Sequence, residues 1–98
     1  MGRLPVGFHP AAAEESAAAE GWYRERSEVA AAAFVAEIDR AVEQISNAPE
    51  RWPRHTHGTR RFVLRRFPFT VIYRFGAADA EIIAVAHGRR RPDYWRSR

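Results

Sequence analysis

Apolar and polar residues alternate most regularly in Arg60–Phe75, where β-branched and aromatic side chains dominate. Phe67-Pro68 interrupts this run at a point where a missing backbone N–H is tolerated, so the stretch predicts a β-hairpin. With a period of two, one face carries Phe62, Leu64, Phe69, Val71, Tyr73 and Phe75. The opposite face carries Arg61, Val63, Arg65, Thr70, Ile72 and Arg74. We expect helices to cover the apolar face and the basic face to stay free for an anion or an acidic partner.

Two helices are predicted in the first half of the chain. Pro10 suits a first helical position, and the alanine-rich stretch Ala11–Tyr23 follows it. In this helix Ala11, Ala18 and Trp22 share a face, which we expect to pack against another helix. Ser27 can cap a second helix that ends at Asn47-Ala48-Pro49. Its apolar positions recur at three- and four-residue spacing, at Ala30, Phe34, Ile38, Ala41 and Ile45.

Two further strands complete the predicted fold. Leu4, Val6 and Phe8 alternate with other residues beside Pro5, which suits an edge strand, and Glu81–His87 is a nearly continuous apolar run. The resulting order is β-α-α-β-β-β. We therefore predict an α+β fold in which a helical hairpin packs on one face of a small, mainly antiparallel sheet, with residues 1–98 forming a single domain.

Composition narrows the possible settings of the protein. The chain has no cysteine, so disulfides and cysteine-ligated metals are excluded. It shows no export signal and no uncharged run near the roughly 20 residues that cross a bilayer. We expect a cytoplasmic protein with no membrane partner.

Charge is divided unevenly along the chain. All 16 basic side chains are arginine. Residues 1–50 hold four arginines and nine acids, net −5, whereas residues 51–98 hold twelve arginines and three acids, net +9. This polarity indicates an anionic or acidic partner for the second half.

The end of the chain combines charge with aromatic rings. Arg89-Arg90-Arg91 stands close to Tyr94 and Trp95, a combination that can hold phosphates and stack on bases. The alternative is a solvated end with Trp95 folded back onto the sheet. Both interpretations remain open on the sequence.

No residue pattern predicts a metal site or a cofactor. His55 and His57 lie on one side of an extended loop, but no carboxylate is close in sequence to complete a ligand shell. We expect His87, at a strand end, to have a structural role. No serine or cysteine nucleophile stands beside a base, and no glycine-rich phosphate loop is present.

Taken together, the ordered motifs resemble the RelE/ParE superfamily of toxins from bacterial type II toxin–antitoxin systems. The resemblance covers nearly the whole chain. It is carried by Phe8-His9-Pro10, Pro49, Gly58, Arg60-Arg61, Phe67-Pro68-Phe69, Ile72-Tyr73-Arg74, Val85-Ala86-His87-Gly88-Arg89-Arg90, Pro92 and Trp95. It implies a toxin that is neutralised by a cognate antitoxin.

The superfamily resemblance implies one of two activities. RelE-like members cut mRNA on the ribosome with basic residues and a tyrosine, whereas ParE-like members inhibit DNA gyrase without nuclease activity. Tyr94 falls at the tyrosine of the RelE-like nucleases and Arg61 at one of their basic positions. Neutral residues occupy the other expected basic positions, at Val63, Thr70 and Gly88. The resemblance therefore favours a ParE-like inhibitor that is not an enzyme.

Two sets of site residues follow from these alternatives. If the protein is a nuclease acting on mRNA and the ribosome, its catalytic residues are Arg61, Arg65, Arg90 and Tyr94. For a ParE-like inhibitor we expect a target-binding basic patch of Arg61, Arg65, Arg74, Arg89, Arg90 and Arg91. The antitoxin should offer an acidic, amphipathic segment to the apolar grooves beside the helices and the exposed strand edge.

Overall fold

The computed structural model describes residues 3–98, so Met1 and Gly2 lie outside the described part. The elements are β1 (Val6–Phe8), α1 (Pro10–Arg24), α2 (Glu28–Asn47), the 3-10 turn η1 (Thr56–Gly58), β2 (Arg60–Val63), β3 (Phe69–Phe75) and β4 (Ala80–His87). This confirms the predicted order β-α-α-β-β-β. Across residues 3–98, neither helix combines the length and the apolar character that a membrane span requires.

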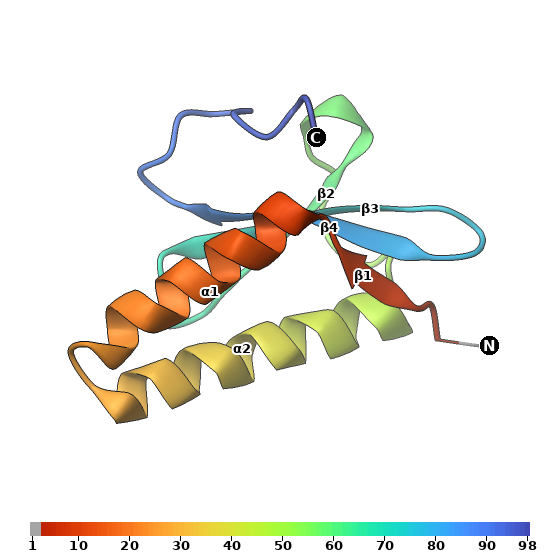
Figure 1. Ribbon diagram of the computed structural model, residues 1–98. Helices are drawn as coiled ribbons and strands as arrows, with labels where there is room; N and C mark the ends of the chain where they lie inside the picture. Colours follow the sequence, from red (N-terminus) through yellow and green to blue (C-terminus); the bar gives the residue numbers. More distant parts are fainter. Residues whose placement is uncertain (1–2) are drawn as a thin grey trace.

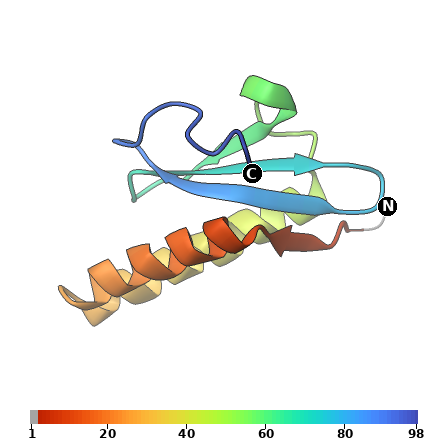
Figure 2. The same cartoon turned by 45° about the horizontal axis from the view of Figure 1, so that its top comes forward.

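The four strands form one sheet in the order β1-β4-β3-β2. β1 runs parallel to β4, and the other two pairs are antiparallel, as expected for a mainly antiparallel sheet. Helices α1 and α2 lie side by side beneath one face of the sheet (Figure 1). Residues 88–98, which we call the tail, cross the opposite face together with η1 (Figure 2). We call these the helical face and the tail face.

Local side chains start both helices where the sequence predicts. His9 Nδ1 accepts a hydrogen bond from the N–H of Ala11 at 3.0 Å, ahead of α1. Ser27 Oγ accepts from the N–H of Ala30 at 3.1 Å, which caps α2. Each cap satisfies a backbone donor that the first helical turn leaves unpaired.

The prediction that Ala11, Ala18 and Trp22 form the packing face of α1 is wrong. The helix buries Ala12 and Ala19 rather than the stripe that contains Ala18, and Trp22 is 52% exposed. Tyr23 sets this rotation, because its ring packs against two aromatic rings of the core. The stripe of Ala18 and Trp22 is left facing outward.

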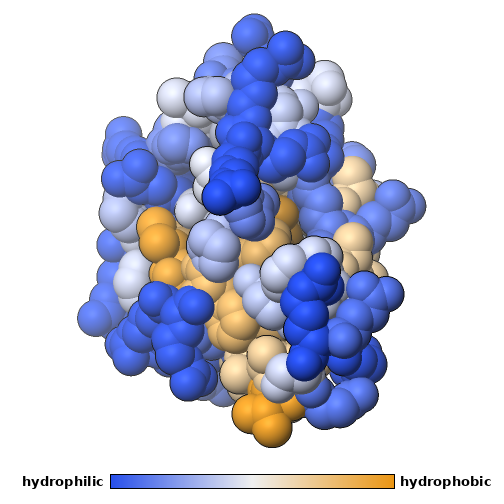
Figure 3. Space-filling model, turned by 90° about the vertical axis from the view of Figure 1, so that its left-hand side faces the viewer, coloured by the Kyte–Doolittle hydropathy of each residue, from blue (hydrophilic) through white to orange (hydrophobic). Residues whose placement is uncertain are grey.

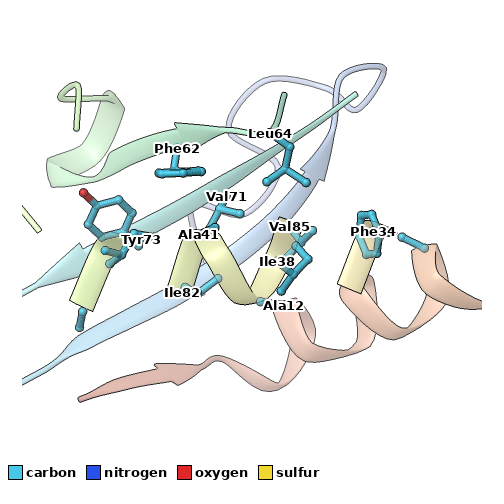
Figure 4. Close-up of a cluster of buried hydrophobic side chains, with 13 residues drawn as sticks. Ala12, Phe34, Ile38, Ala41, Phe62, Leu64, Val71, Tyr73, Ile82 and Val85 are labelled. Atoms are coloured by element: carbon cyan, nitrogen blue, oxygen red, sulfur yellow. The ribbon is translucent and has the colours of Figure 1, made fainter. Parts of the chain in front are cut away.

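The core lies between the helices and the helical face of the sheet (Figure 4). From the sheet and the residue that follows β2 it takes Phe62, Leu64, Val71, Tyr73, Ile82 and Val85. From the helices it takes Ala12, Phe34, Ile38 and Ala41, with Ile45 beside them. The apolar periodicity of α2 and of the hairpin is thus confirmed. Tyr73 is fully buried, and its hydroxyl donates to the carbonyl of Pro49. Burial raises the pKa of Tyr73 to about 12.

A β-bulge alters the tail face. Ile72 pairs with Ala84 and Tyr73 pairs with Ile82, so Ile83 is an extra residue in β4. Ile83 and Ala84 both join Ile72 in a second buried cluster under Trp95, which is 3% exposed. The expectation that this face stays free is therefore wrong. Of the two interpretations of the tail, folding of Trp95 onto the sheet is confirmed.

The turn between β2 and β3 also departs from the prediction. β2 ends at Val63, so Arg65 lies in the loop and not in the strand. Glu37 of α2 explains the difference, because its carboxylate accepts from the backbone N–H of Arg65 at 3.0 Å and from Nε of Arg66 at 3.1 Å. Burial raises the pKa of Glu37, but these hydrogen bonds outweigh it and hold the pKa below its ordinary value.

The two covered faces give a first prediction. Trp95→Ala removes the side chain that buries Ile72 and Ile83, so it should lower the free energy of unfolding by about 3 to 5 kcal/mol. Trp22→Ala removes the same ring from an exposed site and should cost less than about 1 kcal/mol. Urea unfolding of both variants measures the difference. Equal losses would contradict burial of the tail face.

Candidate functional site

A hollow of about 310 Å³ lies between the tail face of the sheet and the tail. Five of the residues that the superfamily resemblance singled out line it: Arg61, Val63, Thr70, Gly88 and Tyr94. Strand pairing brings Val63 opposite Thr70, and the N–H of Gly88 donates to the carbonyl of Pro68 at 2.8 Å. Residues that are far apart in the sequence therefore meet around one depression.

Arginines of the predicted patch are divided among several places. Arg61, Arg90 and Arg91 line the hollow, and Arg65 lines a neighbouring hollow of about 370 Å³ together with Arg61. The guanidinium of Arg90 lies 3.8 Å from the ring centre of Tyr94. The hollow is thus neutral at its centre and cationic at its rim.

Two of the predicted arginines lie elsewhere. Arg74 sits on the tail face but forms an ion pair with Glu81 at 3.0 Å and lines a different hollow. Arg89 is exposed in the tail, and its backbone N–H donates to His87 Nδ1 at 3.0 Å. This contact is of the kind expected for a histidine with a structural role at a strand end.

The middle of the tail is held by Asp93. Its carboxylate accepts from Thr56 Oγ1 at 2.7 Å and lies 3.4 Å from Nε2 of His57. The hydrogen bond from Thr56 is the main reason that the pKa of Asp93 falls below its ordinary value. Both His57 and Asp93 have left-handed backbones, with φ of 58° and 60°, which is uncommon outside glycine. These contacts fix η1 and the tail to each other.

The histidines of the loop pack on a ring. His55 and His57 lie 5.9 and 6.1 Å from Trp95, measured between ring centres. Among residues 3–98, no three histidine or acidic side chains come close enough to hold a metal ion. The loop histidines thus serve to enclose Trp95.

Glu15 of α1 anchors both ends of the tail. Its carboxylate accepts from the N–H of Val85 at 3.0 Å, from the hydroxyl of Tyr94 at 2.7 Å, and from Arg98 at 2.9 and 3.0 Å. Arg90 Nη1 lies 3.9 Å from the same carboxylate. Three tail side chains therefore meet on one acid that lies in the first helix.

This arrangement sets the protonation of both partners. Burial raises the pKa of Glu15, but hydrogen bonds from Arg98, Tyr94 and Val85 outweigh it and hold the pKa below the ordinary value. Burial, with Glu15 beside the ring, raises the pKa of Tyr94 to about 12. At neutral pH Tyr94 is therefore a neutral phenol whose hydroxyl donates a hydrogen bond to the Glu15 carboxylate.

An apolar groove of about 520 Å³ runs beside α1. Ala18 and Trp22 form its helical wall, and Phe69 and Val85 supply its sheet wall. Figure 3 views the molecule from the side where α1 ends and α2 begins, and it shows an apolar depression between hydrophilic side chains. Arg90 and its neighbour His87 line both the groove and the hollow. The two concave surfaces therefore share a wall.

Sequence reasoning missed the roles of two acids, the half-buried Glu15 and the buried Glu37. Each carried a signal, because each falls on an apolar stripe of its helix. Glu15 follows Ala12 by three residues and precedes Ala19 by four, and Glu37 follows Phe34 by three. An acid on such a stripe must be paired when it is buried, so it indicates a cationic partner elsewhere in the chain.

Comparison with known proteins gives a consistent picture. The family model of the ParE toxin of the type II toxin–antitoxin system parDE matches residues 6–92. Eight chains of solved structures match. One of them, described as the chromosomal ParDE toxin–antitoxin system from P. aeruginosa, is 19% identical with a TM-score of 0.74, covering 87% of this chain and 96% of that chain. No curated protein matches the sequence. The structural likeness supports the α+β fold described above.

Glu15 gives a prediction that depends on pH. A carboxylate whose pKa is lower in the folded chain contributes stability above its unfolded pKa, and this contribution is lost as the pH falls through the folded pKa. Glu15→Gln should therefore lower the free energy of unfolding by about 1 to 3 kcal/mol at pH 7. The difference from wild type should shrink as the pH falls below the ordinary value of 4.5.

Urea unfolding between pH 7 and pH 3 measures this difference. Glu14→Gln is the matched control, because Glu14 is the exposed neighbour of Glu15 on the same helix. A difference between wild type and Glu15→Gln that does not change with pH would contradict the charged contact.

Proposed function

The chain belongs to the ParE toxin family of type II toxin–antitoxin systems, and from this membership we propose that it inhibits DNA gyrase. It is the toxin component of such a system, and its family implies a cognate antitoxin. Gyrase acts in the bacterial cytoplasm, so toxin, antitoxin and target would meet there. The alternative activity is ribosome-dependent cleavage of mRNA.

The observation that carries this proposal is the neutral centre of the hollow. Val63, Thr70 and Gly88 converge there, at the positions where the RelE-like nucleases are expected to keep cations. Cleavage of a phosphodiester builds negative charge on the phosphate, and each fixed group that stabilises such charge is often worth about 100-fold or more in rate. A hollow without those groups is a poor nuclease centre.

Tyr94 supports the same interpretation. Its hydroxyl donates to the Glu15 carboxylate at 2.7 Å, so the hydroxyl hydrogen is already engaged in a hydrogen bond within the protein. A catalytic acid or base works best with a pKa near the operating pH, whereas the pKa of Tyr94 is about 12. The tyrosine is better suited to holding the tail than to transferring protons.

The rim of the hollow offers a binding surface for the target. Arg61 and Arg91 are exposed there, and Arg65 lies in the adjoining hollow. An exposed group of guanidinium ions fits an acidic protein surface or a phosphate backbone, both of which an enzyme bound to DNA presents. Binding of this kind needs no bond to be broken by the toxin.

One observation favours the alternative activity. Arg61, Arg90 and Tyr94, three of the four residues expected in a nuclease, do line the same hollow. A ribosome-bound mRNA could enter there and complete the missing charge with ribosomal groups. The test must therefore separate binding from cleavage.

The first functional prediction is that the wild-type chain blocks supercoiling by purified gyrase and leaves ribosome-bound mRNA intact. Tyr94→Phe keeps the ring and removes only the hydroxyl, so inhibition should stay within about 3-fold of wild type, whereas a nuclease that uses the hydroxyl should lose about 100-fold or more. Supercoiling assays and sequencing of mRNA ends measure the two activities. Cleavage of mRNA that disappears in Tyr94→Phe would establish the nuclease instead.

For the antitoxin, we propose the apolar groove beside α1 as the docking surface. Its walls expose Ala18 and Trp22, while His87 and Arg90 stand at its rim. An amphipathic helix with apolar anchors and flanking acids complements this arrangement, because the anchors fill the groove and the acids meet Arg90. The net charge of +9 over residues 51–98 favours an acidic partner as well.

The groove gives a matched pair of variants. Ala18→Glu places a carboxylate in the groove, where the antitoxin would have to bury it, so affinity should fall about 10-fold or more. Ala17→Glu adds the same charge at an exposed neighbouring position that does not line the groove. Co-expression with the antitoxin and titration calorimetry should show loss of neutralisation only for Ala18→Glu. Equal affinities for the two variants would place the antitoxin elsewhere.

A further inference from the structure

We propose that Glu15 is a positioning residue for the target-binding surface, because its carboxylate holds the tail in the orientation that presents Arg61, Arg90 and Arg91 together. The inference rests on the proposed function, in which these rim arginines meet the target. Glu15 itself has a side chain only 16% exposed, so its role is to place other groups.

The contacts of Glu15 are distributed so that they fix the two ends of the tail. Arg90 lies near the start of the tail, and Tyr94 and Arg98 lie further along and at its end. Trp95 and Asp93 hold only the middle of this segment. Residues 88–98 contain no helix or strand, so their orientation depends on such side-chain contacts.

The charge of Glu15 is needed as well as its shape. Arg90 and Arg98 flank one ring, with guanidinium carbons 3.8 and 5.0 Å from the centre of Tyr94. Without an anion between them the two cations would repel each other. The first to move would be Arg90, because its side chain is 52% exposed whereas that of Arg98 is 17% exposed.

The other contacts of Arg98 show how the anchor reaches the sheet. Its Nη1 also donates to the carbonyl of Ile83 at 3.0 Å, and Glu15 accepts from the N–H of Val85. Each member of the Glu15–Arg98 pair is thus also hydrogen-bonded to the backbone of β4. Such charge-assisted, two-pronged contacts are among the strongest that a small domain forms.

The variant Glu15→Gln tests the proposal. The amide keeps one acceptor oxygen, which can serve Val85, but it puts an NH2 group where the second oxygen accepts from Tyr94, and it removes the charge that holds Arg90 and Arg98. Hydrogen–deuterium exchange should rise about 10-fold or more in peptides covering residues 88–98, while the core of α2 stays protected. Inhibition of gyrase and of growth should weaken about 10-fold or more. Glu14→Gln, with the same loss of charge on the same helix, should leave exchange and inhibition unchanged.

A double-mutant cycle with Arg98→Met shows whether Glu15 acts through the tail. The effect of Glu15→Gln on inhibition should be much smaller in the Arg98→Met background than in wild type. Full inhibition by Glu15→Gln with a freed tail would overturn the positioning role, and so would an unchanged exchange rate. Growth inhibition by the wild type without an effect on gyrase would refute the proposed target alone. A wild-type chain that inhibits neither would overturn both proposals.

Discussion

The short first strand imposes the constraint on which the rest of the structure depends. β1 pairs with β4 only between Ala80 and Ile82, so the edge of β4 is open beyond that point. Backbone groups at an open edge must find partners. Helix α1 crosses this edge and Glu15 accepts from Val85, while Arg98 donates to the carbonyl of Ile83. Two side chains thus complete the edge, and their mutual ion pair draws the end of the chain back onto α1.

Closing the edge in this way covers both faces of a small sheet. The helices bury one face, and the tail buries the centre of the other through Trp95. The bulge at Ile83 makes this possible, because it turns Ile83 and Ala84 to the same side. The uncovered remainder of the tail face is the hollow, bordered by the ends of β2 and β3. The position of the candidate site is therefore a consequence of where the tail stops covering the sheet.

Much of the fold could be predicted because its signals are local. Pro10 at the start of α1, the cap at Ser27, the spacing in α2 and the alternation in β3 each depend on neighbours in sequence. The failures arose where distant side chains decide the outcome. Glu37 draws Arg65 out of the strand, and the bulge and Trp95 cover a face that alternation alone leaves open. The division of the arginine patch was unpredictable for the same reason, because Arg74 of β3 forms an ion pair with Glu81 on the neighbouring strand β4.

The uneven charge along the chain also acquires a second meaning. Two acids of the acidic half, Glu15 and Glu37, pair with arginines of the basic half, so part of the polarity is neutralised inside the molecule. In the described residues, Arg61, Arg65, Arg89 and Arg91 take part in no ion pair, and all four are exposed. The arginines that pair with Glu15 and Glu37 lie beside these acids, whereas the four unpaired arginines lie around the hollow and in the tail. Arg90 links the two groups, because it lies near Glu15 and also lines the hollow, so the anchoring acid bears on both stability and the proposed binding of the target.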